Sequence, residues 1–193
     1  MRVLVVYSHP VETSYQAALH RTVVESLQQS GHDVDDCDLY AEGFDPVLSR
    51  TERIAYHDVP ANRDPVRSHV ERLLAAEALV LVYPVWNFGF PAVMKGYFDR
   101  VFLPGVSFKM VDGSLLPCLH NIRRLTAVAT YGGARWRAFM MGNPPRKIVT
   151  RMLRSTIRPG AKVAYLARYD MNNATPEARA KFLDAVAAHM AGF

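Results

Sequence analysis

The sequence predicts an α/β fold in which one parallel sheet of five strands carries helices on both faces. The chain has 193 residues, half of them hydrophobic, which is enough to bury one substantial core and favours a single domain over residues 1–193. Short, mostly continuous apolar runs are typical of strands that are buried on both faces. Segments of helical period separate these runs, which implies right-handed β-α-β crossovers between parallel strands.

The apolar runs define the strands. Four of them are nearly continuous and rich in Val, Leu and Ala, at residues 3–7, 78–83, 125–129 and 161–166. A fifth run, residues 34–39, alternates more and carries Asp35, Asp36 and Asp38. A run that is less apolar and carries several acidic residues fits a strand at the edge of a sheet.

Apolar residues three or four apart predict the helices between these strands. The apolar stripes are Leu19, Val23 and Leu27, then Val66, Val70, Leu73 and Leu74, then Val93, Met94, Tyr97, Phe98 and Val101, and, after Asn143-Pro144-Pro145, Ile148, Val149, Met152 and Leu153. The last helix opens on Thr175-Pro176-Glu177, with a hydroxyl at the N-cap, a proline in the first turn and an acid near the positive end of the helix dipole.

Five strands connected in this way indicate the flavodoxin-like three-layer sandwich, with strand order 2-1-3-4-5. In that order ligands bind beyond the carboxyl ends of the strands, near the switch point between strands 1 and 3. The segments that follow strands 1, 3 and 4 are residues 8–15, 84–92 and 130–142. The long connection over residues 40–64 is predicted to lie over this site, since unstructured loops of that length are commonly functional.

Cysteine content and hydropathy exclude several classes of protein. Cys37 and Cys118 cannot form a disulfide framework, and neither belongs to a C-x-x-C pair or a histidine cluster, so we predict no metal site. The opening apolar run is too short for a signal peptide, and prolines and a glycine break the longest apolar stretch, residues 78–91. We therefore expect a soluble cytoplasmic protein with no membrane insertion.

The formal charge of +5 is unevenly distributed, because no acidic residue occurs between Asp112 and Asp170. The cations in that interval are Arg123, Arg124, Arg135, Arg137, Arg146, Lys147, Arg151, Arg154, Arg158, Lys162 and Arg168. Such a field attracts anions, whether nucleic acid, acidic lipid or the phosphates of a dinucleotide, and a solvated basic face is an equal alternative. The stretch has no recognisable module that reads nucleic acid, so we predict no nucleic-acid partner.

The first strand-end segment, SHPVETSY, places Thr13 and Ser14 where a helix begins. Hydroxyls and free backbone N–H groups at the positive end of a helix dipole form an anion site suited to phosphate. Taken alone, the same residues are explained by an ordinary N-cap. The segment contains neither G-x-G-x-x-G nor a Walker sequence, so it supports neither a Rossmann site nor a nucleotide triphosphatase.

The other two segments add an aromatic wall and backbone donors. Trp86, Phe88 and Phe90 follow the central strand, where they either pack or line a planar ring system. Gly132-Gly133 permits positive φ and close approach of a ligand to the backbone, although a plain turn explains the pair equally well. A phosphate site, a flat aromatic wall and a set of backbone donors on one rim are together what a flavin mononucleotide unit needs.

The order and spacing of YSHPVETSY, DLYAEGFDPVLS, YPVWNFGFPAVMKGYFDRVFLPGVSF and TYGG resemble the NAD(P)H:quinone oxidoreductase family of flavodoxin-like flavoproteins. The resemblance covers most of residues 2–133. It implies a flavin, either FMN or FAD, that NAD(P)H reduces and a quinone or similar small acceptor reoxidises in a ping-pong cycle. It also implies a homodimer with the active site at its interface.

The resemblance also assigns residues to the site. The implied cofactor-binding residues are His9, Thr13, Ser14 and Tyr15 at the phosphate region, Pro84, Val85, Trp86, Asn87 and Phe88 along the isoalloxazine, and Thr130, Tyr131, Gly132 and Gly133 on its pyrimidine side. Trp86, Tyr131 and Arg135 are the candidate catalytic residues. The sequence departs from the family pattern in two places. Tyr131 replaces the second Thr of Thr-Thr-Gly-Gly. The segment after the glycines, ARWRAFMMGNP, lacks the Tyr and His that serve family members as proton partners of the reduced flavin. Arg135, Trp136 and Arg137 are the alternative groups for stabilising an anionic reduced flavin.

The leading prediction is therefore an NAD(P)H dehydrogenase (quinone)-like enzyme, in which the flavin carries the chemistry and the protein supplies stacking, orientation and electrostatics. A flavodoxin-type electron carrier is an alternative, although the basic charge and the missing Thr-x-Thr-Gly-x-Thr loop argue against it. An ancillary flavoprotein subunit of a transporter is a second alternative. A receiver-type signalling domain is excluded, because Ser8-His9 and Tyr83-Pro84 stand where its acidic residues would be.

Overall fold

The computed structural model describes residues 1–193, and its main sheet has five parallel strands in the order β2-β1-β3-β6-β7. The strands are β1 (Arg2–Tyr7), β2 (Asp33–Asp38), β3 (Ala78–Val85), β6 (Arg124–Tyr131) and β7 (Lys162–Arg168). Counting only the parallel strands along the chain, this is the order 2-1-3-4-5. The predicted fold class is therefore confirmed, with the switch point between β1 and β3.

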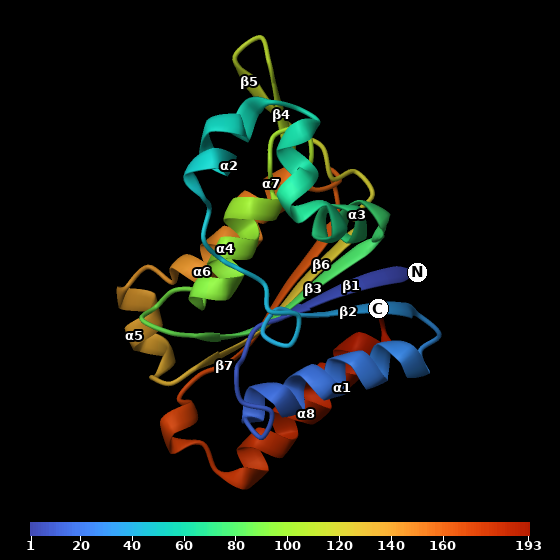
Figure 1. Ribbon diagram of the computed structural model, residues 1–193. Helices are drawn as coiled ribbons and strands as arrows, with labels where there is room; N and C mark the ends of the chain where they lie inside the picture. The colour runs from blue at the N-terminus through green and yellow to red at the C-terminus, as the bar shows by residue number, and fades with distance from the viewer.

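Helices cover both faces of this sheet (Figure 1). On one face, α1 (Tyr15–Gln29) and α8 (Pro176–Ala191) lie side by side. The other face carries α3 (Arg67–Ala75), α4 (Ala92–Val101) and a composite helix of α6 (Pro144–Lys147), the π-helical turn η3 (Ile148–Leu153) and α7 (Arg154–Thr156). No helix combines the length and apolarity that crossing a bilayer requires.

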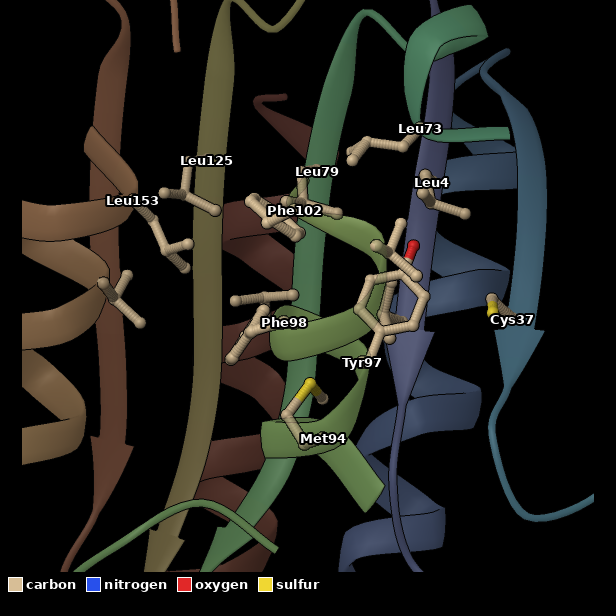
Figure 2. Close-up of a cluster of buried hydrophobic side chains, with 14 of the residues drawn as sticks. Leu4, Cys37, Leu73, Leu79, Met94, Tyr97, Phe98, Phe102, Leu125 and Leu153 are labelled. Atoms are coloured by element: carbon tan, nitrogen blue, oxygen red, sulfur yellow. The ribbon is translucent and has the colours of Figure 1, made fainter. Parts of the chain in front are cut away.

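The two faces of the sheet form two separate cores, because successive residues of a strand point to opposite sides. Val3 and Val5 of β1 pack with α1 and α8, whereas Leu4 and Val6 pack toward α3 and α4. Figure 2 shows the second core, where Met94, Tyr97 and Phe98 of α4 lie against the strands. Full burial of each such side chain contributes about 1.5–3 kcal/mol.

The helix starts that the sequence predicts are formed as expected. Ser14 caps α1, where its Oγ accepts a hydrogen bond from the Ala17 backbone N–H at 3.1 Å. Thr175 caps α8 in the same way, with Pro176 as the first helical residue. An N-cap hydroxyl of this kind contributes about 1 kcal/mol to stability.

The two edges of the sheet differ from its centre. β1, β3 and β6 are buried almost throughout, while β2 and β7 are only half-buried along most of their length. Both chain termini lie at the amino end of the sheet (Figure 1), where the N-terminal amine is 3.4 Å from His32 Nδ1. The carboxyl ends of the strands therefore stand at the opposite end of the molecule from both termini.

A hairpin and a short helix are absent from the sequence prediction, as are the short helical turns of the 40–64 connection and η4 (Met171–Asn173). A two-stranded hairpin, β4 (Phe108–Val111) and β5 (Ser114–Pro117), projects away from the sheet in Figure 1. Its turn consists of Asp112 and Gly113, which have φ values of 49° and 76°, as a type I′ turn requires. The second element is the short helix α5 (Arg135–Met140), which follows β6.

The connection over residues 40–64 folds into α2 (Arg50–Ile54) and two 3₁₀ turns, η1 (Ala55–His57) and η2 (Ala61–Val66). It packs against α4, where Arg100 Nη2 lies 2.7 Å from Glu52 Oε1 and the Arg100 side chain is only 10% exposed. The packing is close at Gly96, where an added Cβ would lie 2.3 Å from the Pro46 carbonyl oxygen. The prediction that this connection lies over the ligand site is therefore wrong for most of its length, since only Tyr40 and Ala41 line a cavity beside β1.

The predicted single helix after Asn143 is interrupted by the π-helical turn η3. In a regular α-helix with 3.6 residues per turn, positions five apart point in directions about 140° apart. The i→i+5 bonding of a π turn brings such positions closer to one face. Arg146 and Arg151, which are five apart, accordingly line the same cavity.

Candidate functional site

The segment between β1 and α1 presents backbone donors at a helix start. The N–H groups of Tyr15 and Gln16 donate to no other group of the chain, as is usual in the first turn of a helix. Thr13 beside them is exposed. The Tyr15 hydroxyl donates to the Arg179 carbonyl at 2.8 Å. The group of Tyr15 that is available to a ligand is therefore its backbone N–H.

His9 connects this segment to the next one. Its Nδ1 lies 3.1 Å from the Val11 backbone nitrogen, which holds the loop after β1 in a tight turn. Its ring centroid is 5.8 Å from that of Trp86, in the segment after β3. The first two of the predicted strand-end segments therefore meet in the fold.

The segment after β3 is a tight turn with unusual backbone angles. Trp86 and Gly89 exchange two backbone hydrogen bonds, of 3.2 and 2.8 Å. Asn87 and Phe88 between them have φ values of 48° and 58°. Left-handed backbone costs non-glycine residues about 1–3 kcal/mol and is concentrated at functional sites. The N–H groups of Asn87 and Phe88 have no acceptor in the chain, so the turn presents two further donors.

The aromatic residues of this turn have different roles. Trp86 and Phe88 are 42% and 38% exposed, so both present ring surface at the strand ends. Phe90, in contrast, packs against Tyr83 and Phe98, with ring centroids 4.7 and 5.2 Å apart. Phe90 therefore belongs to the core, and the prediction that it could line a planar ligand is wrong.

The third segment adds two more donors at Gly132 and Gly133, whose N–H groups donate to nothing in the chain. Their carbonyl groups accept hydrogen bonds from the backbone of Asn172 and Asp170. Neither glycine has a positive φ, so the requirement for glycine at position 132 is spatial. A Cβ there would lie 3.2 Å from Asn172 Oδ1.

A cavity of about 210 Å³ lies between the second and third segments. Its lining consists of Val85, Asn87, Phe88, Tyr131, Gly132, Gly133, Ala134 and Ala138. A second cavity of about 380 Å³, lined in part by Tyr7, His9 and Arg21, lies beside the start of α1. Pro84 is buried as the penultimate residue of β3 and pairs with Thr130 of β6 across the sheet, which sets the two turns side by side.

The side chains of Thr130 and Tyr131 are occupied within the fold. The Thr130 hydroxyl donates to Gln16 Oε1 at 2.7 Å. The Tyr131 hydroxyl donates to Asn143 Oδ1 at 2.7 Å and lies 2.6 Å from the Tyr165 hydroxyl. Burial, together with the neighbouring Tyr165, raises the pKa of Tyr131 well above its usual value. The geometry thus disfavours the prediction that Tyr131 is a reacting group. Tyr131 contributes to the cavity wall, and its hydroxyl is occupied within the fold.

Arg135 and Arg137 lie on α5 and are exposed, and neither forms an ion pair. The Arg137 guanidinium lies 5.3 Å from the ring centroid of its neighbour Trp136. Arg135 lines a separate, larger cavity of about 450 Å³ on the other side of α5. Sequence reasoning identified the basic run but missed this cavity, because the cavity depends on residues from α5, α6, η3 and β7 coming together.

One group of potential metal ligands lies away from the strand ends. Cys37, Glu42 and His69 have ligand atoms within 4.8 Å of one another, which no spacing in the sequence indicates. Both Glu42 carboxylate oxygens accept hydrogen bonds from Arg72 at 2.8 Å. Burial raises the pKa of the Cys37 thiol to about 12. The Glu42 carboxylate is therefore occupied by Arg72, and the Cys37 thiol is neutral at physiological pH.

The strand order defines a doubly wound α/β protein, and the six free backbone donors at one end of the sheet form a candidate ligand site at the switch point. A family model described as "Flavodoxin-like fold" matches residues 1–190. The chain belongs to this family.

Individual relatives and solved structures agree with that family. An uncharacterized NAD(P)H oxidoreductase of Haemophilus influenzae is 34% identical over 122 residues, which are 63% of this chain and 60% of that protein. The NAD(P)H:quinone oxidoreductase from Methanothermobacter marburgensis superposes with a TM-score of 0.83 at 21% identity, covering 99% of this chain and 98% of that one. An FMN-dependent NADH-azoreductase from Bacillus anthracis in complex with FMN gives a TM-score of 0.79 at 16% identity, covering 99% and 98%. The chain spans about half to three fifths of the length of the first curated relatives that it matches.

Proposed function

We propose that this protein is a flavin-dependent NAD(P)H oxidoreductase that reduces quinones or similar small acceptors. The observation that carries the proposal is the set of free backbone N–H groups at the ends of β1, β3 and β6. The residues that carry the donors after β3 and β6 line the cavity of about 210 Å³. These donors come from three segments that are far apart in the sequence and together at one end of the sheet. The donors have no acceptor within the chain, and all except that of Gln16 belong to half-buried or exposed residues, so they are available to a ligand rich in acceptor atoms.

The residues present fit a flavin. Its phosphate would lie at the start of α1, against Thr13, Ser14 and the amides of Tyr15 and Gln16, where the helix dipole favours an anion. The edge of the ring system would receive hydrogen bonds from Asn87 and Phe88. Gly132 and Gly133 would donate to the pyrimidine side from the opposite wall of the cavity.

The protein's own residues would position the reactants. A flavin supplies the chemistry when bound, taking hydride from NAD(P)H and passing two electrons to the acceptor. Trp86 and Phe88 would stack and exclude water, because both present ring surface at the strand ends. Arg135 and Arg137, on the helix that follows Gly133, would add positive potential toward developing negative charge.

The printed names of the relatives support this proposal. The Haemophilus influenzae protein is named an NAD(P)H oxidoreductase, the Methanothermobacter marburgensis protein an NAD(P)H:quinone oxidoreductase and the Bacillus anthracis protein an FMN-dependent NADH-azoreductase. The site described above contains no set of side chains that would catalyse hydride transfer without a cofactor. A bound flavin accounts for both observations.

We also propose that two copies associate through the face around α5. Trp136, Phe139, Met140 and Met141 are 59%, 82%, 72% and 56% exposed, which is a large apolar area for one short segment on a free surface. A second copy of this chain is the occupant that would bring these residues beside the cavity of each protomer. Light scattering coupled to size-exclusion chromatography should give twice the mass of the chain, and a monomeric mass at micromolar concentration would contradict the homodimer.

The flavin proposal is tested with the purified protein. We expect a yellow protein that releases FMN or FAD on heating and oxidises NADH or NADPH in the presence of menadione. In Trp86→Ala the dissociation constant for flavin should rise about tenfold, as expected for a lost stacking contact of about 1–3 kcal/mol. Phe193→Ala, which removes a ring at the opposite end of the sheet, should leave that constant unchanged. A colourless protein that binds no added flavin and oxidises neither nucleotide would refute the proposal.

A further inference from the structure

The largest cavity of the molecule lies outside the site described above. It has a volume of about 450 Å³ and is bounded by α5, by α6 and η3, and by the exposed side of the edge strand β7. Four cationic side chains line it, namely Arg135, Arg146, Lys147 and Arg151. No carboxylate contributes to its lining.

None of these four cations has a partner within the chain. Their side chains form no ion pair, and no hydrogen bond from any of them is present. The sequence offers no acidic residue between Asp112 and Asp170, and Asp170, which follows the lining residue Tyr169, does not itself line the cavity. Like charges gathered around one cavity repel each other and concentrate anions from solution. The lining is therefore complementary to a ligand that carries several negative charges.

The floor of the cavity is aromatic and rigid. Tyr165 and Tyr169 line it, and Tyr169 stacks on Tyr131 with ring centroids 4.5 Å apart. Asn143 fixes these rings, since its Oδ1 accepts from Tyr131 and its Nδ2 donates to the Tyr169 hydroxyl. Phe139, which is 82% exposed, forms part of the rim. Flat aromatic surface beside a group of cations matches a nucleotide, which combines a base with phosphates.

The cavity is adjacent to the proposed flavin site. Ala134 and Ala138 line the smaller cavity, while Arg135 and Phe139 line the larger one. One short helix thus separates the two, and Tyr131 contributes to the smaller cavity and stacks on the floor of the larger. A dinucleotide whose nicotinamide reached the smaller cavity would have its adenosine end within reach of the larger one.

We infer that the cavity between α5 and η3 binds the phosphorylated adenosine end of NADPH and selects this donor over NADH. The inference rests on the proposed function and specifies its electron donor. The 2′-phosphate is the one group that distinguishes the two donors, and it carries about −1.5 to −2 charge at neutral pH, as phosphate monoesters do. Arg146 and Arg151, which the π turn brings to the same cavity, are the residues assigned to it.

Binding is tested first without any turnover. Calorimetry should show that 2′,5′-ADP binds at least about tenfold more tightly than 5′-AMP, a difference equivalent to about 1.4 kcal/mol. The difference should disappear in Arg146→Ala/Arg151→Ala. The difference should persist in Arg154→Ala/Arg158→Ala. This control removes the same number of charges from two exposed positions a few residues further along the chain, and neither position lines the cavity. Equal binding of both nucleotides, or inorganic phosphate competing as well as 2′,5′-ADP, would overturn the assignment.

Steady-state kinetics separates this inference from the proposed function. In Arg146→Ala/Arg151→Ala the KM for NADPH should rise about tenfold with kcat unchanged, and the KM for NADH should change little. Oxidation of both donors with the same KM in the unmodified protein would overturn the inference and leave the oxidoreductase intact. If neither donor is oxidised, the proposed function fails, while calorimetry still decides whether the cavity recognises a 2′-phosphate.

Discussion

The two edges of the sheet carry opposite charges, which are partly paired at one edge and unpaired at the other. At the β2 edge, two of the four aspartates form ion pairs, Asp35 with Arg72 and Asp36 with His20, at 2.7 Å each. At the β7 edge, the cations around the largest cavity have no partners. Paired charges in a half-buried setting hold the structure together, whereas unpaired charges around a cavity are available to a ligand. The contrast separates the arginines that stabilise the fold from those that are available to the proposed ligand.

Arg72 is the centre of the acidic edge. Its guanidinium contacts Asp35 and both oxygens of Glu42, and it also donates to the Asp36 carbonyl at 2.8 Å. Burial lowers the pKa of Arg72, but the hydrogen bonds to Asp35 and Glu42 outweigh burial and raise it. The Arg72 side chain is 20% exposed and that of Asp35 15% exposed, so little water is available to replace these contacts.

The largest effect is expected from Arg72→Ala. Removing one partner of a largely buried pair leaves Asp35 and Glu42 without compensation and should lower the free energy of unfolding by about 3 kcal/mol. Urea denaturation followed by circular dichroism measures this change. Arg146→Ala at the opposite edge is the matched control and should change stability by less than about 0.5 kcal/mol. Similar losses in the two variants would remove the distinction between the edges.

A smaller effect is expected from pH, again at the acidic edge. Burial lowers the pKa of His69 below its usual value, despite the nearby carboxylate of Glu42. The unfolded chain therefore binds a proton at His69 more readily than the folded chain, and stability should be lost as the pH falls from about 6.5 through the depressed folded pKa.

The matched variant for this pH effect is His69→Gln, which cannot titrate. It should flatten the dependence of the denaturation midpoint on pH between about 6.5 and 5. The change in slope with pH is the quantity to compare, because the substitution also alters packing against Phe44, whose ring is 4.9 Å away. An unaltered slope would show that His69 does not contribute.

The smallest effect is expected at the basic edge. Millimolar phosphate should stabilise the protein by about 0.5–1 kcal/mol, because an anion that binds only the folded state adds to its stability. The increase in melting temperature should be absent in Arg146→Ala/Arg151→Ala and retained in Arg154→Ala/Arg158→Ala. Chloride at equal ionic strength provides the comparison for general screening, and an equal shift with chloride would argue against a specific anion site.

The sequence was sufficient for features that depend on local pattern. The five parallel strands and the caps at Ser14 and Thr175 are all present. The β4-β5 hairpin was missed although its Asp112-Gly113 pair is a strong local signal. Each strand of the hairpin has only four residues, mostly exposed, so neither forms the long apolar run that marks a core strand.

Features that depend on distant residues could not be predicted in the same way. Glu52 and Arg100 are 48 positions apart and pair only because the 40–64 connection folds onto α4. The hydroxyls of Tyr131 and Tyr165 meet across two neighbouring strands, which turned a candidate reacting group into part of the core. The strand-end position of the candidate site was predicted, but which side chains turn inward follows from packing that no local pattern encodes.

The π turn at η3 has an evolutionary consequence. A π turn holds one more residue than the α-helical turn it replaces, so a deletion of one codon within residues 148–150 would restore a regular helix. Arg151 would then stand four positions after Arg146, and residues four apart in an α-helix point in directions only about 40° apart. Both arginines would therefore still face the cavity after the deletion. The cationic lining is thus expected to tolerate this change in the length of the helix, and substitution of the arginines themselves is the direct genetic route to losing it.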